Sequence, residues 1–209
     1  MTTNYHHGDL KNALIRAGIE ILSKEGMQAL SLRNVAKKAG VSHAAPYAHF
    51  ADKQALIAAI AAEGYKKLYQ QLVTAQNSTN DPLARLLAVA HAYIQFAIDE
   101  ADHFKITFSG VVEVEQNYPE YVEQSKQCFG LVVAVVADCQ AEGTLLQGDT
   151  QLIAVSIWAS IHGFVLLLQG NQLPSTLLEQ YSIQELFGFH LKQFLSTESH
   201  IPSNNVIQP

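Results

Sequence analysis

Hydrophobic residues recur at helical spacing along most of the chain. Between residues 9 and 25, Leu10, Leu14, Ala17 and Ile21 follow steps of three and four, and Gly26 ends the pattern. This spacing places apolar side chains on one face of an α-helix. The same periodicity predicts helices over residues 52–75, 82–101, 102–112, 119–142, 149–170 and 183–196. With no convincing strand pattern and no internal repeat, the sequence predicts an all-α fold.

Residues 31–40 predict a short helix followed by a tight turn. Ser31 is a suitable N-cap, because its hydroxyl can accept from an N–H of the first helical turn. Leu32, Val35 and Ala36 form one apolar face. Gly40 then stands where a helix ends most easily with a residue of positive φ.

A second short helix is predicted directly after this turn, over residues 43–49. Ser42 is its N-cap candidate, and Pro46 falls in its first turn, where a missing N–H has no helical partner to lose. Two short capped helices joined by a glycine turn are the pattern of a helix-turn-helix.

A polar, turn-rich segment over residues 76–82 divides the chain. We therefore predict an N-terminal domain over residues 8–68 and a larger helical domain over residues 79–197. The polar residues 198–209 are predicted to be a disordered tail.

The most apolar stretch is the 17-residue run from Leu152 to Leu168, which Ser156, Ser160 and His162 interrupt. A membrane span needs about 20 predominantly apolar residues, so we predict a buried helix and no membrane partner. A helix that is apolar on every side must be covered on every side. It is therefore either central to the second domain or shared between two subunits.

Charge is distributed unevenly along the chain of 209 residues. The first 67 residues hold nine Lys and Arg against five acidic residues, a net charge of +4, whereas the remainder holds four against fourteen, a net charge of −10. This asymmetry favours an N-terminal module that meets a polyanion, although an ordinary solvated surface would look similar. Only two cysteines occur, which fits a reducing cytoplasm.

The N-terminal residues resemble the TetR/AcrR family of transcriptional regulators. The matching pattern, G-V-S-x-x-x-x-Y-x-H-F-x-x-K-x-x-L, is formed by Gly40, Val41, Ser42, Tyr47, His49, Phe50, Lys53 and Leu56. Trp158, His162 and Gly163 are also similar to a W-x-x-x-H-G element of one subgroup. The resemblance implies a three-helix helix-turn-helix DNA-binding domain followed by a larger helical effector-binding and dimerisation domain. It further implies a homodimer on a palindromic double-stranded operator, usually as a repressor, and no cofactor.

The start of the second short helix should enter the major groove of DNA. We expect the base edges to be met by His43, Ala44 and Ala45. Phosphate contacts are expected from Tyr47, His49 and Lys53. Arg33 is a candidate for phosphate or a neighbouring base, and Ser42 is also expected to belong to the DNA-binding surface. The alternative for Tyr47 and His49 is that they only cap the end of their helix.

The resemblance also implies a pocket for a small apolar or amphipathic effector among the later helices. Candidate lining residues are His91, Phe96, Phe104, Phe108, Tyr121, Phe129, Trp158 and His162. Aromatic residues at helical spacing are more often core than ligand wall, and a lone histidine is more often a core residue. The homodimer is expected to form through residues 152–168 and 183–196, the alternative being a monomer with a covered core.

We find no catalytic motif, no metal-ligand spacing and no phosphate-binding loop, so the sequence does not predict an enzyme. Cys128 and Cys139 are eleven residues apart on one predicted helix, about 16 Å at the helical rise, too far to form an intrahelical disulfide. Two alternatives remain. One is a helical adaptor or scaffold without DNA activity, and the other is a regulator that responds through its thiols.

Overall fold

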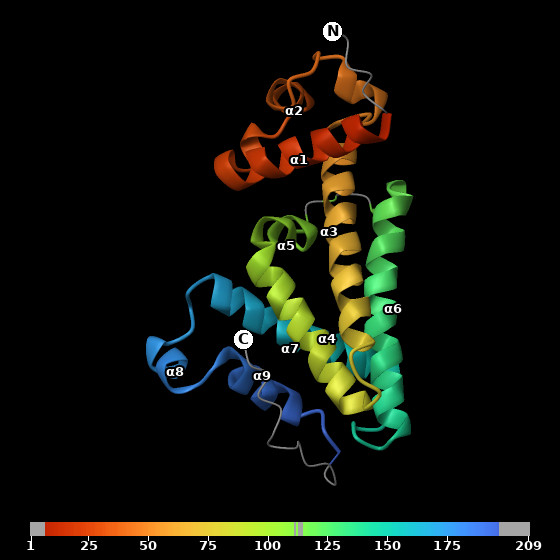
Figure 1. The fold of residues 1–209 in the computed structure, drawn as a ribbon, viewed down its shortest axis with the longest axis vertical. Coiled ribbons are helices and arrows are strands. Elements are labelled where there is room, and N and C mark those ends of the chain that lie inside the picture. Colours follow the sequence, from red (N-terminus) through yellow and green to blue (C-terminus); the bar gives the residue numbers. More distant parts are fainter. Residues whose placement is uncertain (1–6, 111, 113–114, 197–209) are drawn as a thin grey trace. The chain divides into compact units, whose positions relative to one another are not determined.

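The computed structural model describes residues 7–110, 112 and 115–196, and within them the fold is all-α, as predicted (Figure 1). The predicted tail at 198–209 lies outside the described residues. The α-helices are α1 (His7–Glu25), α2 (Leu32–Lys38), α3 (Lys53–Gln76), α4 (Pro82–Asp99), α5 (Ala101–Thr107), α6 (Pro119–Ala141), α7 (Thr150–Gln169), α8 (Ser175–Gln180) and α9 (Ile183–Lys192). Short 3₁₀ turns are η1 (Met27–Ala29), η2 (Ala45–Ala48) and η3 (Glu115–Asn117).

Local capping explains why most helix boundaries agree with the sequence prediction. The Ser31 hydroxyl accepts from the N–H of Asn34 at 3.1 Å, and Asp149 accepts from the N–H groups of Gln151 and Leu152. Gly40 has the expected positive φ of 71°. The short helix α8 was not predicted, because its six residues are too few to show a helical period.

The chain forms two compact units, one made of Met1–Gln70 with Phe96–Cys128 and the other of Gln71–Gln95 with Phe129–Pro209. This division differs from the sequence-based boundary at residues 76–82. The reason is that α5 packs against α1 and that the first half of α6 is tied to the first unit. Lys11 pairs with Glu120 at 3.0 Å, and the thiol of Cys128 donates to the carbonyl of Tyr65 at 3.3 Å. The functional domains 8–68 and 79–197 remain a prediction.

The core of the first unit is built from the apolar faces of its helices. Leu14, Leu30, Val35, Leu56 and Ile60 are all nearly inaccessible to solvent. Each such side chain contributes roughly 1.5–3 kcal/mol to folding when it is fully buried. This core fixes the position of the helix-turn-helix stretch.

In the second unit, polar contacts at the ends of the helices hold the loop between α6 and α7. The buried amide of Gln140 donates to the carbonyls of Leu146 and Gly148, and the Thr150 hydroxyl donates to its oxygen at 2.7 Å. An isolated antiparallel bridge joins Leu145 to Leu195 beyond α9. The loop between α6 and α7 is therefore fixed within this unit.

Candidate functional site

The helix-turn-helix stretch has the predicted first helix and turn. In α2, Leu32, Val35 and Ala36 are buried, whereas Arg33 is exposed on the opposite face. The turn is held by the N–H of Val41, which donates to the carbonyl of Ala36 at 3.0 Å. Since η2 packs against α2, the second element follows in a fixed orientation.

The second element is shorter than predicted. A helix over residues 43–49 was expected, but the structure has the four-residue 3₁₀ turn η2 with Ala44 at its N-cap position and no side-chain cap from Ser42. Pro46 has no N–H, so the α-helical bond to the carbonyl of Ser42 cannot form. The 3₁₀ bonds from Ala45 to Ser42 at 3.0 Å and from Tyr47 to Ala44 at 3.2 Å stand in its place.

Solvent exposure separates the residues of this stretch into two groups. Ser42, His43 and Ala44 are exposed, and the side chain of Tyr47 is 63% exposed. Exposed aromatic and polar side chains beside a turn are available to a macromolecular surface. Ala45 and His49 are half-buried, while Pro46 and Phe50 belong to the core.

Lys53 is more constrained than a free phosphate anchor would be. Its ammonium group donates to the carbonyl of Met27 at 2.9 Å, and the residue is half-buried. An ammonium has three donors, so this bond leaves capacity for a further acceptor. The neighbouring Asp52 caps α3 by accepting from the N–H of Ala55 at 2.8 Å.

The residues predicted to line an effector pocket fall into two separate clusters. In the first unit, Phe104 packs against Phe108 with ring centroids 4.8 Å apart and against Phe96 at 6.4 Å. Tyr65 adds edge-to-face contacts to Phe108 at 5.3 Å and to Tyr121 at 5.6 Å. Phe96, Phe104 and Tyr121 are buried, as expected for a core cluster.

The second cluster lies in the other unit and combines aromatic and polar groups. Phe129 and His162 each pack against Trp158, with ring centroids 6.1 and 6.2 Å apart. The Tyr93 hydroxyl lies 2.7 Å from Nδ1 of His162 and accepts from the indole N–H of Trp158 at 3.2 Å. Burial lowers the pKa of His162 below its ordinary 6.5. His91 is half-buried on α4.

A small apolar cavity of about 30 Å³ adjoins this cluster. Its lining residues are Leu72, Leu86, Val89, Ala90, Tyr93, Val132, Trp158 and Ile161. Of the predicted pocket residues only Trp158 lines it, and sequence reasoning did not single out Tyr93 as its polar partner. Pockets for drug-sized molecules have volumes of roughly 300–1,000 Å³, so this cavity would have to expand to accept one.

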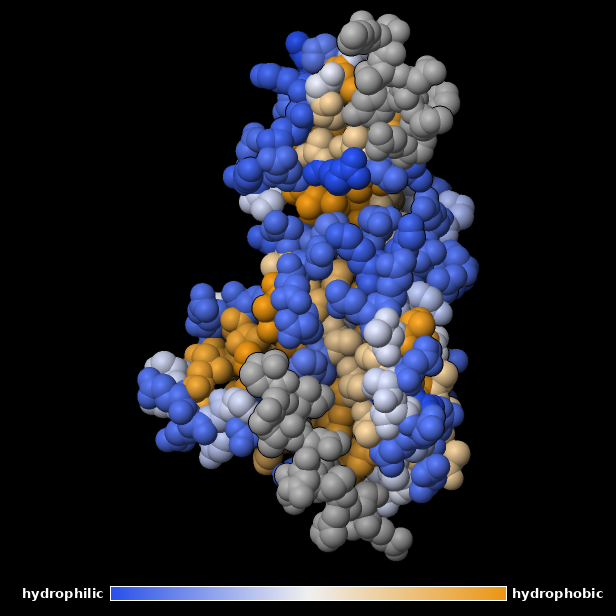
Figure 2. All heavy atoms as spheres, viewed as in Figure 1, coloured by the Kyte–Doolittle hydropathy of each residue, from blue (hydrophilic) through white to orange (hydrophobic). Residues whose placement is uncertain are grey.

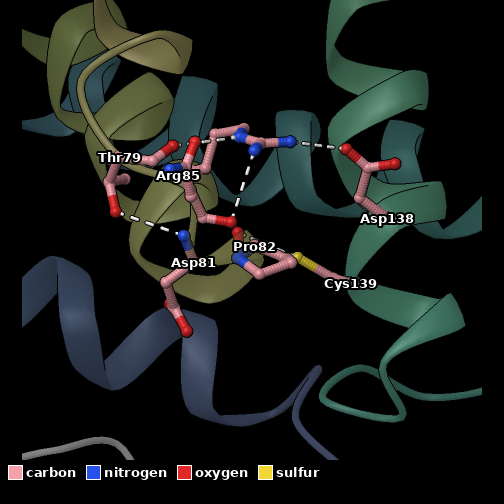
Figure 3. A network of polar contacts seen from close by, with 7 residues as sticks. Thr79, Asp81, Pro82, Arg85, Asp138 and Cys139 are labelled. Atoms are coloured by element: carbon pink, nitrogen blue, oxygen red, sulfur yellow. Dashed lines mark hydrogen bonds and ion pairs between the residues drawn. The ribbon is translucent and has the colours of Figure 1, made fainter.

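Both cysteines are buried in structural positions. Figure 3 shows the thiol of Cys139 beside Pro82, whose carbonyl it contacts at 3.2 Å, in a network where Arg85 pairs with Asp138. Burial raises the pKa of Cys139 to about 11 and that of Cys128 to about 12. Since the thiolate is the reactive form, neither thiol has the character of a redox sensor.

The described residues contain no group of three or more His, Cys, Asp or Glu side chains that could hold a metal ion. The expectation of no metal site and no catalytic residue, made from the sequence, stays a prediction.

Within the chain, α7 is not covered on every side, so of the two expected places for the apolar helix the central one in the second domain is wrong. One face of α7 is buried through Ala154, Ile157 and Phe164, but only 28% of its most apolar window is buried. Length and composition alone would let α7 cross a membrane, but a single such helix is weak evidence of a membrane span, because the core helix of a soluble protein meets the same criteria.

An apolar patch covers part of the second unit. In Figure 2, hydrophobic residues gather over the region where Figure 1 shows the end of α7 and α8. The exposed apolar side chains of α7, α8 and α9 and the residue after α8 are Leu152, Val155, Leu166, Leu167, Leu178, Tyr181 and Phe189. Exposed apolar patches of this kind mark interaction sites.

Two family models match this chain. Residues 14–60 match the model described as bacterial regulatory proteins, tetR family, and residues 86–194 match the tetracyclin repressor-like C-terminal domain. The uncharacterized HTH-type transcriptional regulator YobS of Bacillus subtilis (strain 168) is 25% identical over 189 residues, which cover 90% of this chain and 92% of that protein.

Solved structures show the same fold. A protein with unknown function from Rhodococcus sp. RHA1 is 32% identical, with a TM-score of 0.77 over 92% of this chain and 97% of that one. The fatty acid degradation regulator FadR from Bacillus halodurans is 16% identical, with a TM-score of 0.71 over 91% and 97% of the two chains. At that identity the likeness concerns the fold alone.

Proposed function

The chain belongs to the TetR family of DNA-binding transcriptional regulators, and we propose that it is a repressor that binds a palindromic operator as a homodimer. A small apolar or amphipathic effector would release it. The family membership rests on both matched regions. We also propose that it acts in the cytoplasm, where its DNA lies, and without enzymatic activity.

The exposed residues of the turn and η2 support the assignment of the DNA-reading edge. His43 and Ala44 are exposed and directly precede η2, which packs on α2, so they can reach base edges without unfolding any of the core. The exposed Tyr47 would contact phosphate, with His49, Lys53, Arg33 and Ser42 around it and Ala45 beside the reading edge. The single observation that carries the proposal is this exposed edge on a buried helix-turn-helix core.

The exposed face of α7 supports a homodimer through α7 and α9. Leu152 is 66% exposed and Phe189 on α9 is 74% exposed. Between the apolar residues of α7 lie small ones, among them Ala159 and Gly163, and a Cβ built on Gly163 would meet no atom within 4 Å. Small residues let a second helix approach closely, and covering such a face with a second copy satisfies its burial.

The cavity beside Trp158 supports an apolar effector. Its lining is apolar, and Tyr93, one of the lining residues, carries a hydroxyl that lies 2.7 Å from Nδ1 of His162. An effector that binds only an expanded form would shift the population of conformations, and its influence is limited by its differential affinity for the two forms. The helix α3, which contributes residues to both compact units, is the proposed mechanical link.

The deciding experiment is selection of bound duplexes from a random pool by the full-length protein. A recovered palindrome with two half-sites about one helical turn apart is expected. Recovery of no preferred sequence, together with no salt-dependent binding to duplex DNA, would favour the adaptor or scaffold alternative.

The sign of regulation and the effector need a second measurement. A reporter gene behind the selected operator should be expressed less when the protein is present. An increase would make the protein an activator. If no compound from a panel of alkyl acids, alcohols and aromatic compounds changes operator affinity, the effector part of the proposal fails.

A further inference from the structure

Most lysines of the N-terminal 67 residues are already paired with carboxylates inside the fold. These pairs are Lys11–Glu120 at 3.0 Å, Lys24–Glu20 at 2.8 Å, Lys38–Glu20 at 2.7 Å, Lys66–Glu63 at 3.6 Å and Lys67–Glu100 at 3.1 Å. A paired cation attracts phosphate less than a free one. The net charge of this region therefore overstates the number of cations that DNA can use.

Arg33 and Lys37 on α2 are different. Both are exposed, and neither forms an ion pair with a carboxylate among residues 7–110, 112 and 115–196. They stand four residues apart, so their side chains lie on the same helix face. Like charges at this spacing repel by a few tenths of a kcal/mol, and an anion placed over both would remove that repulsion.

Lys38 follows directly in the sequence but has another role. It is rotated by about 100° around the helix from Lys37, and its ammonium contacts Oε1 of Glu20 on α1. Lys24 binds the same oxygen, and hydrogen bonds from the two lysines hold the pKa of Glu20 at about 2. Because Glu20 pairs with Lys38, Lys38 joins α2 to α1, whereas the adjacent Lys37 faces solvent.

We propose that Arg33 and Lys37 form a phosphate-binding ridge on α2, with Lys37 as a DNA-positioning residue, while Lys38 has a structural role. In a helix-turn-helix the first helix crosses the DNA backbone. Here α2 is that helix, it packs against η2, and its exposed face carries both cations. The inference rests on DNA binding and adds a residue that the motif does not contain.

The test compares Lys37→Gln with Lys38→Gln, two changes of the same kind on neighbouring residues. Both remove one charge from the last turn of α2, so effects on the helix dipole are matched. The probe is a random-sequence duplex of about 30 base pairs, and affinity is measured over a series of salt concentrations. Far-UV circular dichroism and thermal unfolding check that both variants are folded.

Each phosphate contact contributes about 0.9 to the slope of log affinity against log salt. Lys37→Gln should therefore reduce the slope by about 1 per bound subunit. Lys38→Gln should leave this slope equal, within error, to that of the wild-type protein. The matched pair Lys37→Ala and Lys38→Ala repeats the comparison if a glutamine variant is poorly folded.

If the slope of log affinity against log salt were equal in the two variants, or were reduced more by Lys38→Gln, the proposed phosphate-binding ridge would be wrong. A wild-type protein whose duplex binding does not depend on salt would instead argue against the DNA-binding surface as a whole. The two failures are distinguishable, because the second appears before any substitution is made.

Discussion

The hydroxyl of Tyr93 links His162 to Trp158, with Nδ1 of His162 at 2.7 Å and the indole nitrogen at 3.2 Å. The indole N–H is a donor only, so the hydroxyl accepts from it. Burial favours the neutral imidazole of His162, and its tautomer sets which of the two groups donates in the contact with Tyr93. The three side chains bind α4 to α7 beside the apolar cavity.

Removing this hydroxyl should destabilise the protein. In Tyr93→Phe the indole N–H and Nδ1 of His162 lose their shared partner in a part-buried site, and each lost bond of this kind costs about 1–3 kcal/mol. Urea unfolding followed by circular dichroism measures the change. Tyr181→Phe, at an exposed position, is the control and should be near neutral. Equal stability of the two variants would contradict the role of the network.

Stability should fall in mild acid through two histidines. Burial is the largest cause that lowers the pKa of His162 and of His103, and Lys67 lowers the latter further. Below their ordinary value of 6.5, the unfolded chain binds protons that the folded chain does not, so the free energy of unfolding decreases as pH falls. The loss begins near that pH and continues towards the lowered values.

The variant His162→Gln should lose less stability than the wild type between about pH 7.5 and pH 5.5, because one of the two groups no longer titrates. Urea unfolding at both pH values gives the comparison. His43→Gln, at an exposed position, is the control. If the free energy of unfolding of His162→Gln fell as much in acid as that of the wild type, protonation of His162 would not be a cause of the loss of stability.

Gly64 allows α5 to pack closely on α3. A Cβ at this position would overlap Oγ1 of the buried Thr107 and lie 3.6 Å from the carbonyl oxygen of His103. Gly64→Ala should therefore destabilise by about 1–3 kcal/mol from overpacking, despite the better helix propensity of alanine. Thermal and urea unfolding provide the measurement.

Two variants make the Gly64 prediction specific. Thr107→Ala removes the overlapping oxygen, so the double variant should be more stable than the sum of the two single changes implies. Gly130→Ala on α6 has open space around the new methyl group and should stabilise by up to about 1 kcal/mol. If the stability changes of Gly64→Ala and Thr107→Ala were additive in the double variant, the overlap between α3 and α5 would not be the cause of the destabilisation.

The proposed dimer makes a prediction about the exposed residues of α7 and α9. A carboxylate buried in an apolar interface is strongly unfavourable, so Phe189→Asp and Leu152→Asp should yield monomers at micromolar concentrations in analytical ultracentrifugation. Ile98→Asp is the control, because Ile98 is 46% exposed on α4, outside the proposed interface. Dimers that persist in both interface variants would place the two-fold contact elsewhere.

The two thiols should be unreactive in the folded protein. With pKa values of about 12 and about 11, Cys128 and Cys139 are almost entirely protonated at neutral pH. A thiol reagent such as dithionitrobenzoate should label neither in buffer and both in denaturant. Rapid labelling of the native protein, with a change in operator affinity after oxidation, would revive the thiol-responsive alternative.

Local chemistry made much of the fold predictable from sequence. Ser31, Gly40, Asp52 and Asp149 act within a few residues of themselves, so their capping and turn roles follow from neighbouring positions. Pro46 was placed correctly in a first turn, but its effect on the type of helix was missed. Without its N–H, four residues form a 3₁₀ turn where seven were expected to form a helix.

The candidate pocket could not be predicted correctly from the helical periodicity of the sequence. Helical spacing indicates which side chains share a face, but not which helices meet. Phe104 and Phe129 were therefore assigned to one pocket, although they lie in different compact units. The bond between Lys53 and the carbonyl of Met27 is likewise a contact between distant positions that no local pattern signals.

Pro46 and Phe50 are buried, whereas His43 and Ala44, only a few residues away, are exposed. If the proposed DNA-reading edge is correct, folding and operator choice depend on different side chains of one short segment. Substitutions at the exposed pair leave the hydrophobic core untouched, so a library of variants there would be expected to stay folded. New operator preferences could then arise by changing one or two residues, and this makes the segment a suitable starting point for building regulators with altered targets.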